Sequence, residues 1–255
     1  VADAAVLILQ QPFAAATGRF YIDETNKLGY ESVDNEYPSH YRNSKRLLII
    51  SNELSRLIWS RLKPHLTRED LKGVKPFGFD NNGIWKPVGV NECFRFSRYD
   101  RGEFFKPHVD GMFVRNKDER SIFTVLLYLN DDFTGGETEL MKVSETNRQE
   151  FELVTKLKPK AGTAVIFNQD LPHSGSPITQ GSKYILRTDL MFYRTDSKSI
   201  FPSNYQTSED YQRATELLEK SEECELAGEV EQATKYYLEA QGLQVLSDAS
   251  AKIQN

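Results

Sequence analysis

Two histidines, one aspartate and one lysine lie at positions in the chain that suggest metal chemistry. His108 and Asp110 are separated by a single residue, His173 comes much later, and Lys183 follows His173 by ten residues. Two histidines and a carboxylate can bind one face of an octahedral ferrous ion, which leaves two positions for a chelating co-substrate and one for dioxygen. These residues therefore predict an oxygenase.

The pair His108 and Asp110 is a weak signal by itself, because His-x-Asp is common by chance and also occurs as an exposed pair at a strand end. In a strand, residues two apart point to the same side, so both side chains can reach one metal. His173 follows a predicted strand and turn at Phe167–Pro172, which would return it to the same end of a barrel. His40 and His65 have no such setting, and we interpret them as structural or solvated.

Helical and irregular segments come before the candidate site. The spacing of apolar residues predicts an amphipathic helix over Asn52–Leu66, with Ser51 or Asn52 as its N-cap. The segment Lys75–Val90 is rich in proline, glycine and asparagine, which predicts a loop that could cover the site. The segment Gly111–Arg120 is a second candidate lid.

Short β-rich segments bounded by turn residues fill the middle of the chain and predict a sandwich or jelly roll. They are Glu92–Tyr99, Ile122–Leu129, Thr138–Lys142, Gly162–Phe167 and Tyr184–Tyr193. Beyond Tyr205 the composition predicts a helical hairpin that begins after Ser208, is interrupted at Gly228 and Gly242, and resembles half of a tetratricopeptide repeat. We expect this hairpin to pack on the core or on a partner.

Polar residues alternate with apolar ones on two of these strands. Lys183, Arg187 and Asp189 share one face of the last strand, and unpaired buried charge is costly, so this face is expected to meet a polar ligand inside the barrel. On an earlier strand, Asn91 and Arg95 share a side with Tyr99. Arg95 predicts a polar or acidic substrate, or else a buried arginine paired with a structural carboxylate.

The composition argues against several classes of protein. Of the 255 residues, 39% are apolar and 27% are charged, as in an ordinary globular protein without a membrane span. A net charge of −5 gives no general attraction to nucleic acid, so a nucleic-acid demethylase ranks last. Cys93 and Cys224 cannot form a disulfide framework, which indicates a reducing, intracellular compartment, cytoplasmic or nuclear. Without an initial methionine or a signal sequence, the N-terminus is interpreted as trimmed.

Several motifs together resemble the prolyl 4-hydroxylase branch of the 2-oxoglutarate and iron(II)-dependent dioxygenases, over roughly residues 45–195. They are Tyr99–Asp110, Tyr128–Asn130, Gly135–Thr138 and His173–Lys183, together with Pro159, Gly162, Phe167, Pro177 and Gly181 in the order and spacing of that branch. The resemblance implies a mainly β fold with flanking helices. Residues 1–205 would form a double-stranded β-helix (a cupin-like jelly roll) with N-terminal helical support, and residues 206–255 the helical hairpin.

The resemblance also implies roles for individual residues. His108, Asp110 and His173 would bind Fe(2+), and 2-oxoglutarate would chelate the metal while Lys183 pairs with its far carboxylate. Tyr128 would supply a hydroxyl group to that carboxylate, and Tyr99 would line the same pocket. Gly135 and Gly136 are interpreted as structural turn residues.

Arg187 leaves one assignment open. Its guanidinium could replace Lys183 as the carboxylate anchor, although the ten-residue offset from His173 favours Lys183. Arg187 is otherwise expected to contact the substrate or Asp189. The candidate substrate residues are Arg95, Asn91 and Trp85.

The implied activity is hydroxylation of an unactivated C–H bond with Fe(2+), 2-oxoglutarate and O2, with ascorbate as a supporting reductant. The first expected substrate is a prolyl residue in a peptide or protein. A free amino acid or small metabolite is the alternative. From another class, the chain could be a non-catalytic scaffold that binds a protein partner through its hairpin. Retention of Asp110 argues against halogenation, because that chemistry needs its coordination position for chloride.

Overall fold

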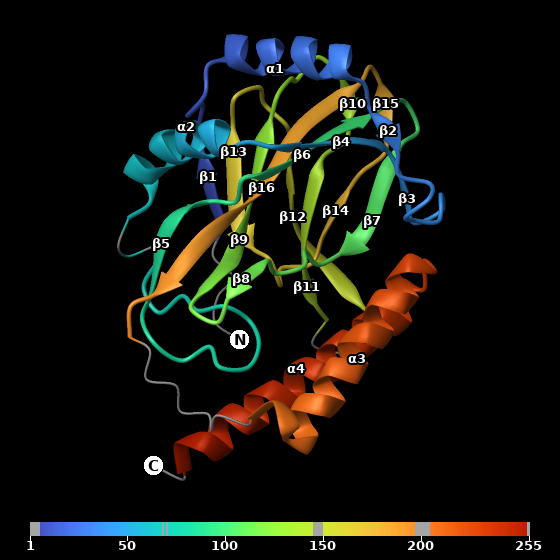
Figure 1. The fold of residues 1–255 in the computed structure, drawn as a ribbon. Coiled ribbons are helices and arrows are strands. Elements are labelled where there is room, and N and C mark those ends of the chain that lie inside the picture. The colour runs from blue at the N-terminus through green and yellow to red at the C-terminus, as the bar shows by residue number, and fades with distance from the viewer. Residues whose placement is uncertain (1–5, 68, 70, 145–149, 197–204, 254–255) are drawn as a thin grey trace.

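The computed structural model in Figure 1 describes residues 6–253 apart from 68, 70, 145–149 and 197–204. Its largest unit is a nine-stranded antiparallel sheet in the order β1-β13-β9-β16-β6-β4-β2, with β5 paired to β16 and β8 to β9. The strands are β1 (Val6–Leu9), β2 (Glu31–Ser32), β4 (Lys45–Ile50), β5 (Trp85–Val90), β6 (Cys93–Tyr99), β8 (Val114–Asn116), β9 (Glu119–Tyr128), β13 (Ala164–Asn168) and β16 (Lys183–Arg194).

A second antiparallel sheet of five strands faces the first, in the order β12-β11-β14-β7-β3. Its strands are β3 (Arg42–Asn43), β7 (Phe104–His108), β11 (Thr138–Val143), β12 (Phe151–Leu157) and β14 (His173–Gly175). A two-stranded ribbon of β10 (Thr134–Gly135) and β15 (Ile178–Gln180) lies at one end. The two facing sheets confirm the predicted mainly β, jelly-roll architecture.

The alternation of side chains on β16 separates the two sides of the large sheet. Tyr184, Leu186 and Leu190 join the core that packs under α1 (Ala15–Leu28) and α2 (Asn52–Leu62). Ile185 belongs instead to a smaller apolar cluster between the sheets, on the face that also carries Lys183, Arg187 and Asp189. The predicted polar face of this strand therefore points into the barrel.

Helix α2 begins as the sequence predicts, because the Ser51 hydroxyl accepts a hydrogen bond from the Leu54 amide. It ends at Leu62 and continues as the 3-10 helix Lys63–His65, where Pro64 lacks the amide that a further turn would need. No helix in the described part of the chain is long and apolar enough to cross a membrane.

The prediction of a loop over Lys75–Val90 is wrong for its second half. Trp85–Val90 forms β5, which pairs only with β16 and is therefore an edge strand. Pro87 is tolerated there because one side of an edge strand needs no amide donor, and the register with β16 shifts beside it. The expected Gly111–Arg120 lid is likewise partly regular, since it contains β8 paired to β9.

The C-terminal segment forms the predicted hairpin, preceded by the short 3-10 helix Tyr205–Thr207. Its helices are α3 (Glu209–Leu226), capped by Ser208, and α4 (Val230–Ile253). Gly228 makes the turn with a positive φ of 76°. Gly242, expected to interrupt the helix, lies inside α4 instead. The division into domains at residue 205 stays a prediction.

The hairpin packs on the body of the protein through two aromatic residues of the loop that precedes β5. Phe79 is buried against Ala214, Leu217 and Ala240, and Phe77 stacks on Tyr237 with ring centroids 5.6 Å apart. Figure 1 shows the hairpin crossing one end of the barrel beside β7 and β11. The hairpin thus covers the end at which β7 delivers His108.

Arg194 fixes the loop that carries these aromatic residues. Its side chain is 1% exposed, pairs with Asp80 at 3.0 Å and with Asp118 at 2.7 Å, and lies over the ring of Trp85. Removing one partner of a buried ion pair leaves an uncompensated charge. We expect Arg194→Met to lower the free energy of unfolding by about 3–5 kcal/mol in urea denaturation.

The matched control for Arg194 is Arg213→Met on α3. Arg213 is an exposed arginine whose nearest carboxylate oxygens, on Glu216 and Glu239, lie 3.5 Å away. Exposed ion pairs contribute about 0–1 kcal/mol, so this variant should unfold at nearly the wild-type urea concentration. Equal effects of the two substitutions would contradict the anchoring role of Arg194.

Candidate metal centre

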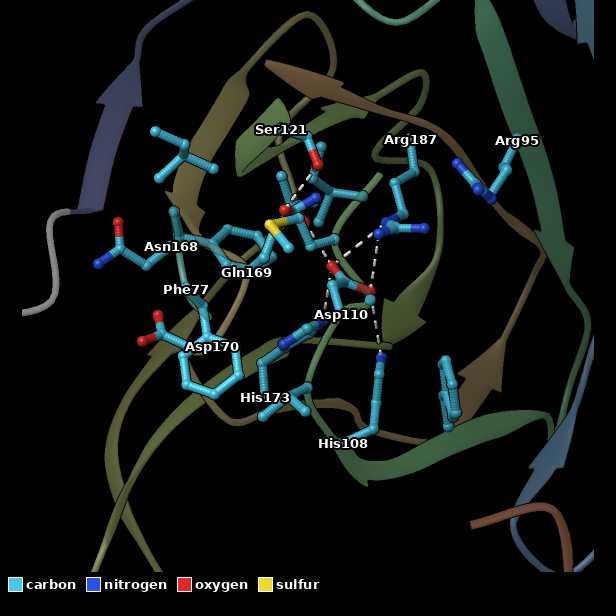
Figure 2. A pocket seen from close by; sticks show the side chains of 18 of the residues that line it. Phe77, Arg95, His108, Asp110, Ser121, Asn168, Gln169, Asp170, His173 and Arg187 are labelled. Carbon is cyan, nitrogen blue, oxygen red and sulfur yellow. Dashed lines mark hydrogen bonds and ion pairs between the residues drawn. The ribbon is translucent and has the colours of Figure 1, made fainter. Parts of the chain in front are cut away.

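The space between the two sheets opens into a cavity of about 1410 Å³ at the end covered by the hairpin. The predicted site residues that line it are Arg95, Tyr99, His108, Asp110, His173, Lys183 and Arg187. Figure 2 shows His108, Asp110 and His173 converging in this cavity, with Arg187 next to Asp110. The structure therefore brings the predicted metal ligands and the predicted carboxylate anchor into one space.

His108, Asp110 and His173 each offer a ligand atom, and these atoms lie within 4.8 Å of one another. His108 ends β7 and His173 begins β14, and the two residues are paired directly in the sheet. Asp110 lies just beyond β7, where its amide donates to the Gln169 carbonyl. The expectation that one strand carries both His108 and Asp110 is thus corrected: a turn after the strand aims Asp110.

The backbone sets which nitrogen of each imidazole faces the centre. Nδ1 of His108 lies 2.8 Å from the Lys106 carbonyl oxygen, and Nδ1 of His173 lies 3.0 Å from that of Leu171. A carbonyl oxygen only accepts, so each Nδ1 carries the proton and each Nε2 keeps its lone pair. The Nε2 atoms lie 4.0 Å and 3.6 Å from the oxygens of Asp110. This is the tautomer that a metal site needs.

The protonation states also suit a cation. Burial lowers the pKa of both His108 and His173, so the two rings are neutral near pH 7. Burial alone would raise the pKa of Asp110, but the Arg187 guanidinium, together with smaller effects of the two imidazoles and the Thr124 hydroxyl, keeps that pKa well below its usual value. Two neutral imidazoles and one carboxylate match the ligands that bind ferrous iron in facial triads.

Arg187 holds Asp110 in a way that the sequence did not predict. Its Nη2 lies 3.0 Å from Oδ1 of Asp110, and its Nε donates to Oδ2 at 3.2 Å. Thr124 donates to the same Oδ2 at 2.5 Å. The expected pair between Arg187 and Asp189 is also present, at 3.3 Å. Arg187 therefore orients a metal ligand, and its predicted contacts with 2-oxoglutarate or substrate stay predictions.

Asp189, which is 1% exposed, is the centre of a buried polar network behind the triad. It accepts hydrogen bonds from Asn91 at 3.0 Å and from Gln169 at 3.1 Å, and Arg95 lies 3.5 Å away. Ser121 in turn donates to Gln169. For Arg95, the alternative of a pair with a structural carboxylate is thus present, although this residue also lines the cavity.

Two candidate substrate residues do not line the cavity. Asn91 is buried. Its side-chain amide donates to Asp189, and its side-chain oxygen accepts from the backbone amide of Cys93. Trp85 is buried in the outer core, where its indole donates to the Asn81 carbonyl. Asn91 supports the polar network and Trp85 supports the loop, and their predicted contacts with substrate stay predictions.

Lys183 lies inside the cavity with 4% of its surface exposed. Its Nζ donates to the Gly136 carbonyl at 2.6 Å and lies 5.8 Å and 5.5 Å from the ring centres of Tyr99 and Tyr128. Gly136 has a positive φ of 67°, and a Cβ there would collide with Ile178, which supports the predicted structural role of this glycine. A buried ammonium with a neutral carbonyl partner is prepared to bind an anion.

Tyr128 does not reach the cavity directly. Its hydroxyl donates to the Thr138 hydroxyl at 2.7 Å, and Thr138 itself lines the cavity. The predicted contact between Tyr128 and a ligand carboxylate stays a prediction, and Thr138 is a polar group that the sequence analysis missed. Thr124 was missed as well, although both residues occupy inward positions of predicted strands.

Comparison with known proteins identifies this site. Residues 94–188, which contain all three candidate metal ligands and Lys183, match the profile of the 2OG-Fe(II) oxygenase superfamily. The segment that carries the site is therefore similar to that superfamily. The family resemblance predicted from the motifs is confirmed, and with it Fe(2+) and 2-oxoglutarate as the cofactor and co-substrate of the oxygenase segment.

Relatives of the oxygenase segment include prolyl hydroxylases. A protein of Acanthamoeba polyphaga mimivirus named "Putative prolyl 4-hydroxylase" is 29% identical over 136 residues, which are 41% of this chain and 52% of that protein. A Trichoplax adhaerens prolyl hydroxylase, in complex with a peptide fragment of the hypoxia inducible factor oxygen degradation domain, shares the fold with a TM-score of 0.52. It is 16% identical and covers 76% of this chain and 86% of its own. A viral collagen prolyl hydroxylase from Paramecium Bursaria Chlorella virus-1 gives a TM-score of 0.47 at 20% identity, covering 74% and 96% of the two chains.

The environment of Lys183 gives a testable pH dependence for the oxygenase segment. Burial lowers the pKa of Lys183 to about 8, with only a smaller opposing effect from Glu137. A bound carboxylate raises that pKa again, so above pH 8 binding must take up a proton. We expect the affinity for 2-oxoglutarate to be constant just below pH 8 and to fall about tenfold per pH unit above it.

Titration of 2-oxoglutarate into the iron(II)-containing protein under nitrogen, at several pH values, measures this dependence. In Lys183→Arg the guanidinium keeps its charge throughout, so any affinity that the variant retains should not vary with pH. If the affinity of the wild-type protein for 2-oxoglutarate stays constant up to about pH 9.5, the buried lysine is not the anion site.

Proposed function

We propose that this chain is an iron(II)- and 2-oxoglutarate-dependent dioxygenase that hydroxylates an unactivated C–H bond, first of all in a prolyl residue of a peptide or protein. One observation carries the proposal: a correctly protonated His-Asp-His set and a buried lysine line the same cavity. The mimivirus relative, which this chain matches over about half of its length (52%), supports the choice of proline.

In this proposal each side chain has a defined task. His108, Asp110 and His173 bind iron(II) through Nε2 and carboxylate oxygens, and Lys183 pairs with the far carboxylate of 2-oxoglutarate. The iron supplies oxidative decarboxylation, in which one oxygen atom of O2 enters succinate and the other enters the substrate as hydroxyl, with release of carbon dioxide. Arg187 and Thr124 hold the carboxylate of Asp110 in place throughout.

The walls of the cavity exclude water from one side of the centre. Phe105 stacks on the His108 ring at 3.5 Å, and Phe167 meets His173 edge-on at 4.7 Å. These rings limit the movement of the two imidazoles and shield them from solvent. We expect substrate to approach the metal centre from the part of the cavity that the hairpin lines.

The size of the cavity favours a peptide over a free amino acid. Sites for small molecules usually enclose about 300–1,000 Å³, and this cavity of about 1410 Å³ is larger. The Trichoplax relative is in complex with a peptide fragment. A small-metabolite hydroxylase would need a closed pocket around the metal, whereas here the space extends to the C-terminal helices.

Mass spectrometry of reaction mixtures tests the proposal. The protein is incubated with iron(II), 2-oxoglutarate, ascorbate and oxygen, and either with a mixture of proline-containing peptides or with free amino acids. We expect succinate formation to rise with peptides and one oxygen atom to be added at proline. Oxygen addition to a free amino acid alone would favour the alternative substrate class, and no product from any of them would contradict hydroxylation at proline.

A further inference from the structure

The C-terminal hairpin is part of the cavity rather than a separate appendage. Five residues of α3 and two of α4 line the same space as the metal ligands: Leu218, Ser221, Glu222, Glu225, Leu226, Tyr237 and Gln241. Figure 1 shows the two helices crossing one end of the barrel, beside β7 and β11. The hairpin therefore forms part of the space that a substrate at the metal centre would occupy.

The hairpin is fixed in this position by contacts on both sides of the cavity. Phe77 and Phe79 hold α3 and α4 from the loop before β5. On the other side, the Tyr41 hydroxyl donates to Glu225 at 2.7 Å, and the His40 ring packs so close to Gly228 that a Cβ there would overlap it. The wall that α3 presents to the cavity is thus held in one arrangement.

Three carboxylates line the cavity on the side of the hairpin. Asp170, Glu222 and Glu225 line it, and within the part of the chain that the structure describes no cation lies within ion-pair distance of any of the three. On the barrel side, Arg95 is paired with Asp189, Arg187 with Asp110, and Arg46 with Glu36. Lys183 donates to the Gly136 carbonyl, and Arg42 donates to the Ser44 hydroxyl. Among the described residues, the carboxylates on the hairpin side therefore have no ion-pair partner, and they line the substrate space.

Glu225 is the best placed of these carboxylates. It is partly buried, and burial raises its pKa, although Tyr41 and Arg42 act in the opposite direction. Tyr41, itself 1% exposed, fixes one oxygen of the carboxylate. Glu222 is exposed on the same helix, where an ion pair contributes little. A carboxylate that is already oriented and partly desolvated binds a cation with less loss of entropy.

We infer that the α3–α4 hairpin forms one wall of the substrate site and that Glu225 binds a lysine or arginine side chain of the peptide substrate. This inference rests on the proposed peptide hydroxylase function and adds a sequence preference to it. The basic side chain would lie in the same cavity as the hydroxylated residue, because Glu225 and Asp110 both line it.

A binding experiment without turnover tests the inference. The full-length protein, immobilised under nitrogen with iron(II) and 2-oxoglutarate, is exposed to a random peptide library with one fixed central proline, and retained peptides are sequenced by mass spectrometry. We expect lysine and arginine to be enriched about tenfold at one position, as a partly desolvated ion pair would give. In Glu225→Gln this enrichment should vanish, while the amide oxygen still accepts from Tyr41.

Control variants separate this effect from general electrostatics. Glu219→Gln removes the same charge from an exposed position of α3 that does not line the cavity, and should keep the wild-type enrichment. Tyr41→Phe keeps the ring but frees Glu225, and should reduce the enrichment only in part. Absence of enrichment in the wild type, its persistence in Glu225→Gln, or an equal loss in Glu219→Gln would overturn the inference.

The visible charge-transfer band of iron(II) with bound 2-oxoglutarate, measured on each sample, distinguishes two kinds of failure. A wild-type protein that shows the band but no enrichment overturns the role of Glu225 and leaves the oxygenase proposal standing. A wild-type protein without the band contradicts the proposed function, and the inference that rests on it fails with it.

Discussion

Replacement of His173 by alanine is expected to lower the affinity for iron(II) by more than about 100-fold, which is the upper range for loss of a residue that only supports a metal ligand. His173 supplies one of three ligand atoms, and its Nε2 is directed at the centre by the hydrogen bond of Nδ1 to the Leu171 carbonyl. Equilibrium dialysis of iron(II) under nitrogen measures the change. Hydroxylation should fall below detection at iron concentrations that saturate the wild type.

Two further variants distinguish the loss of a metal ligand from unfolding of the protein. Asp110→Asn keeps the size of the side chain and should lose iron to a similar degree, because the amide removes the only negative charge of the ligand set. His65→Ala removes an exposed histidine and should bind iron as the wild type does. Retention of wild-type iron affinity by a folded His173→Ala protein would exclude the triad as the metal site.

Substitution of Lys183 and of Arg187 should have separable effects, which decides between the two candidate anchors. Lys183→Ala is expected to raise the dissociation constant for 2-oxoglutarate at least about 30-fold, because losing one partner of a buried charge pair costs 2 kcal/mol or more. Its iron affinity should stay near that of the wild type, since Lys183 contacts Gly136 rather than the triad.

Arg187→Met should show the opposite pattern. The guanidinium contacts both oxygens of Asp110, so its loss is expected to weaken iron binding about 10- to 100-fold. The affinity for 2-oxoglutarate, measured at saturating iron, should change much less than in Lys183→Ala. If Arg187→Met loses 2-oxoglutarate as strongly while Lys183→Ala does not, the anchor is Arg187 and the assignment of Lys183 is wrong.

The sequence predicts well those features that depend on neighbours along the chain. The alternation from Lys183 to Leu190 identifies both the strand and the face that points into the barrel, because side chains in a strand point alternately to its two sides. Ser51 marks the start of α2 through a hydrogen bond three residues away. The order and spacing of the family motifs likewise predict the fold and bring the triad together.

Features that depend on distant partners could not be predicted in this way. Arg187 and Asp110 are 77 residues apart, and nothing in the sequence around either residue indicates that they form a pair. The segment Trp85–Val90 has the residues of a loop and becomes a strand only because the edge of β16 is available. Trp85, expected near the substrate, is instead buried beside Arg194, over a hundred residues later.

The position of the hairpin is the feature of the fold that the sequence predicts least well. Its helices are evident from composition, but the residues that place it over the cavity are single aromatic side chains in an irregular loop, such as Phe77 and Phe79. The sequence gives no reason to single out Glu225, because α3 contains many glutamates. Only its contact with Tyr41 distinguishes it from its neighbours.

Anaerobic titration of the purified protein with iron(II) and then 2-oxoglutarate is the most direct test of the central claim, that one cavity binds both. We expect the weak visible metal-to-ligand charge-transfer band to appear when both are present, and to be absent in His173→Ala. Because this band requires 2-oxoglutarate to chelate the iron, binding at separate places cannot produce it. A folded wild-type protein that shows no band at saturating concentrations of both would contradict the account.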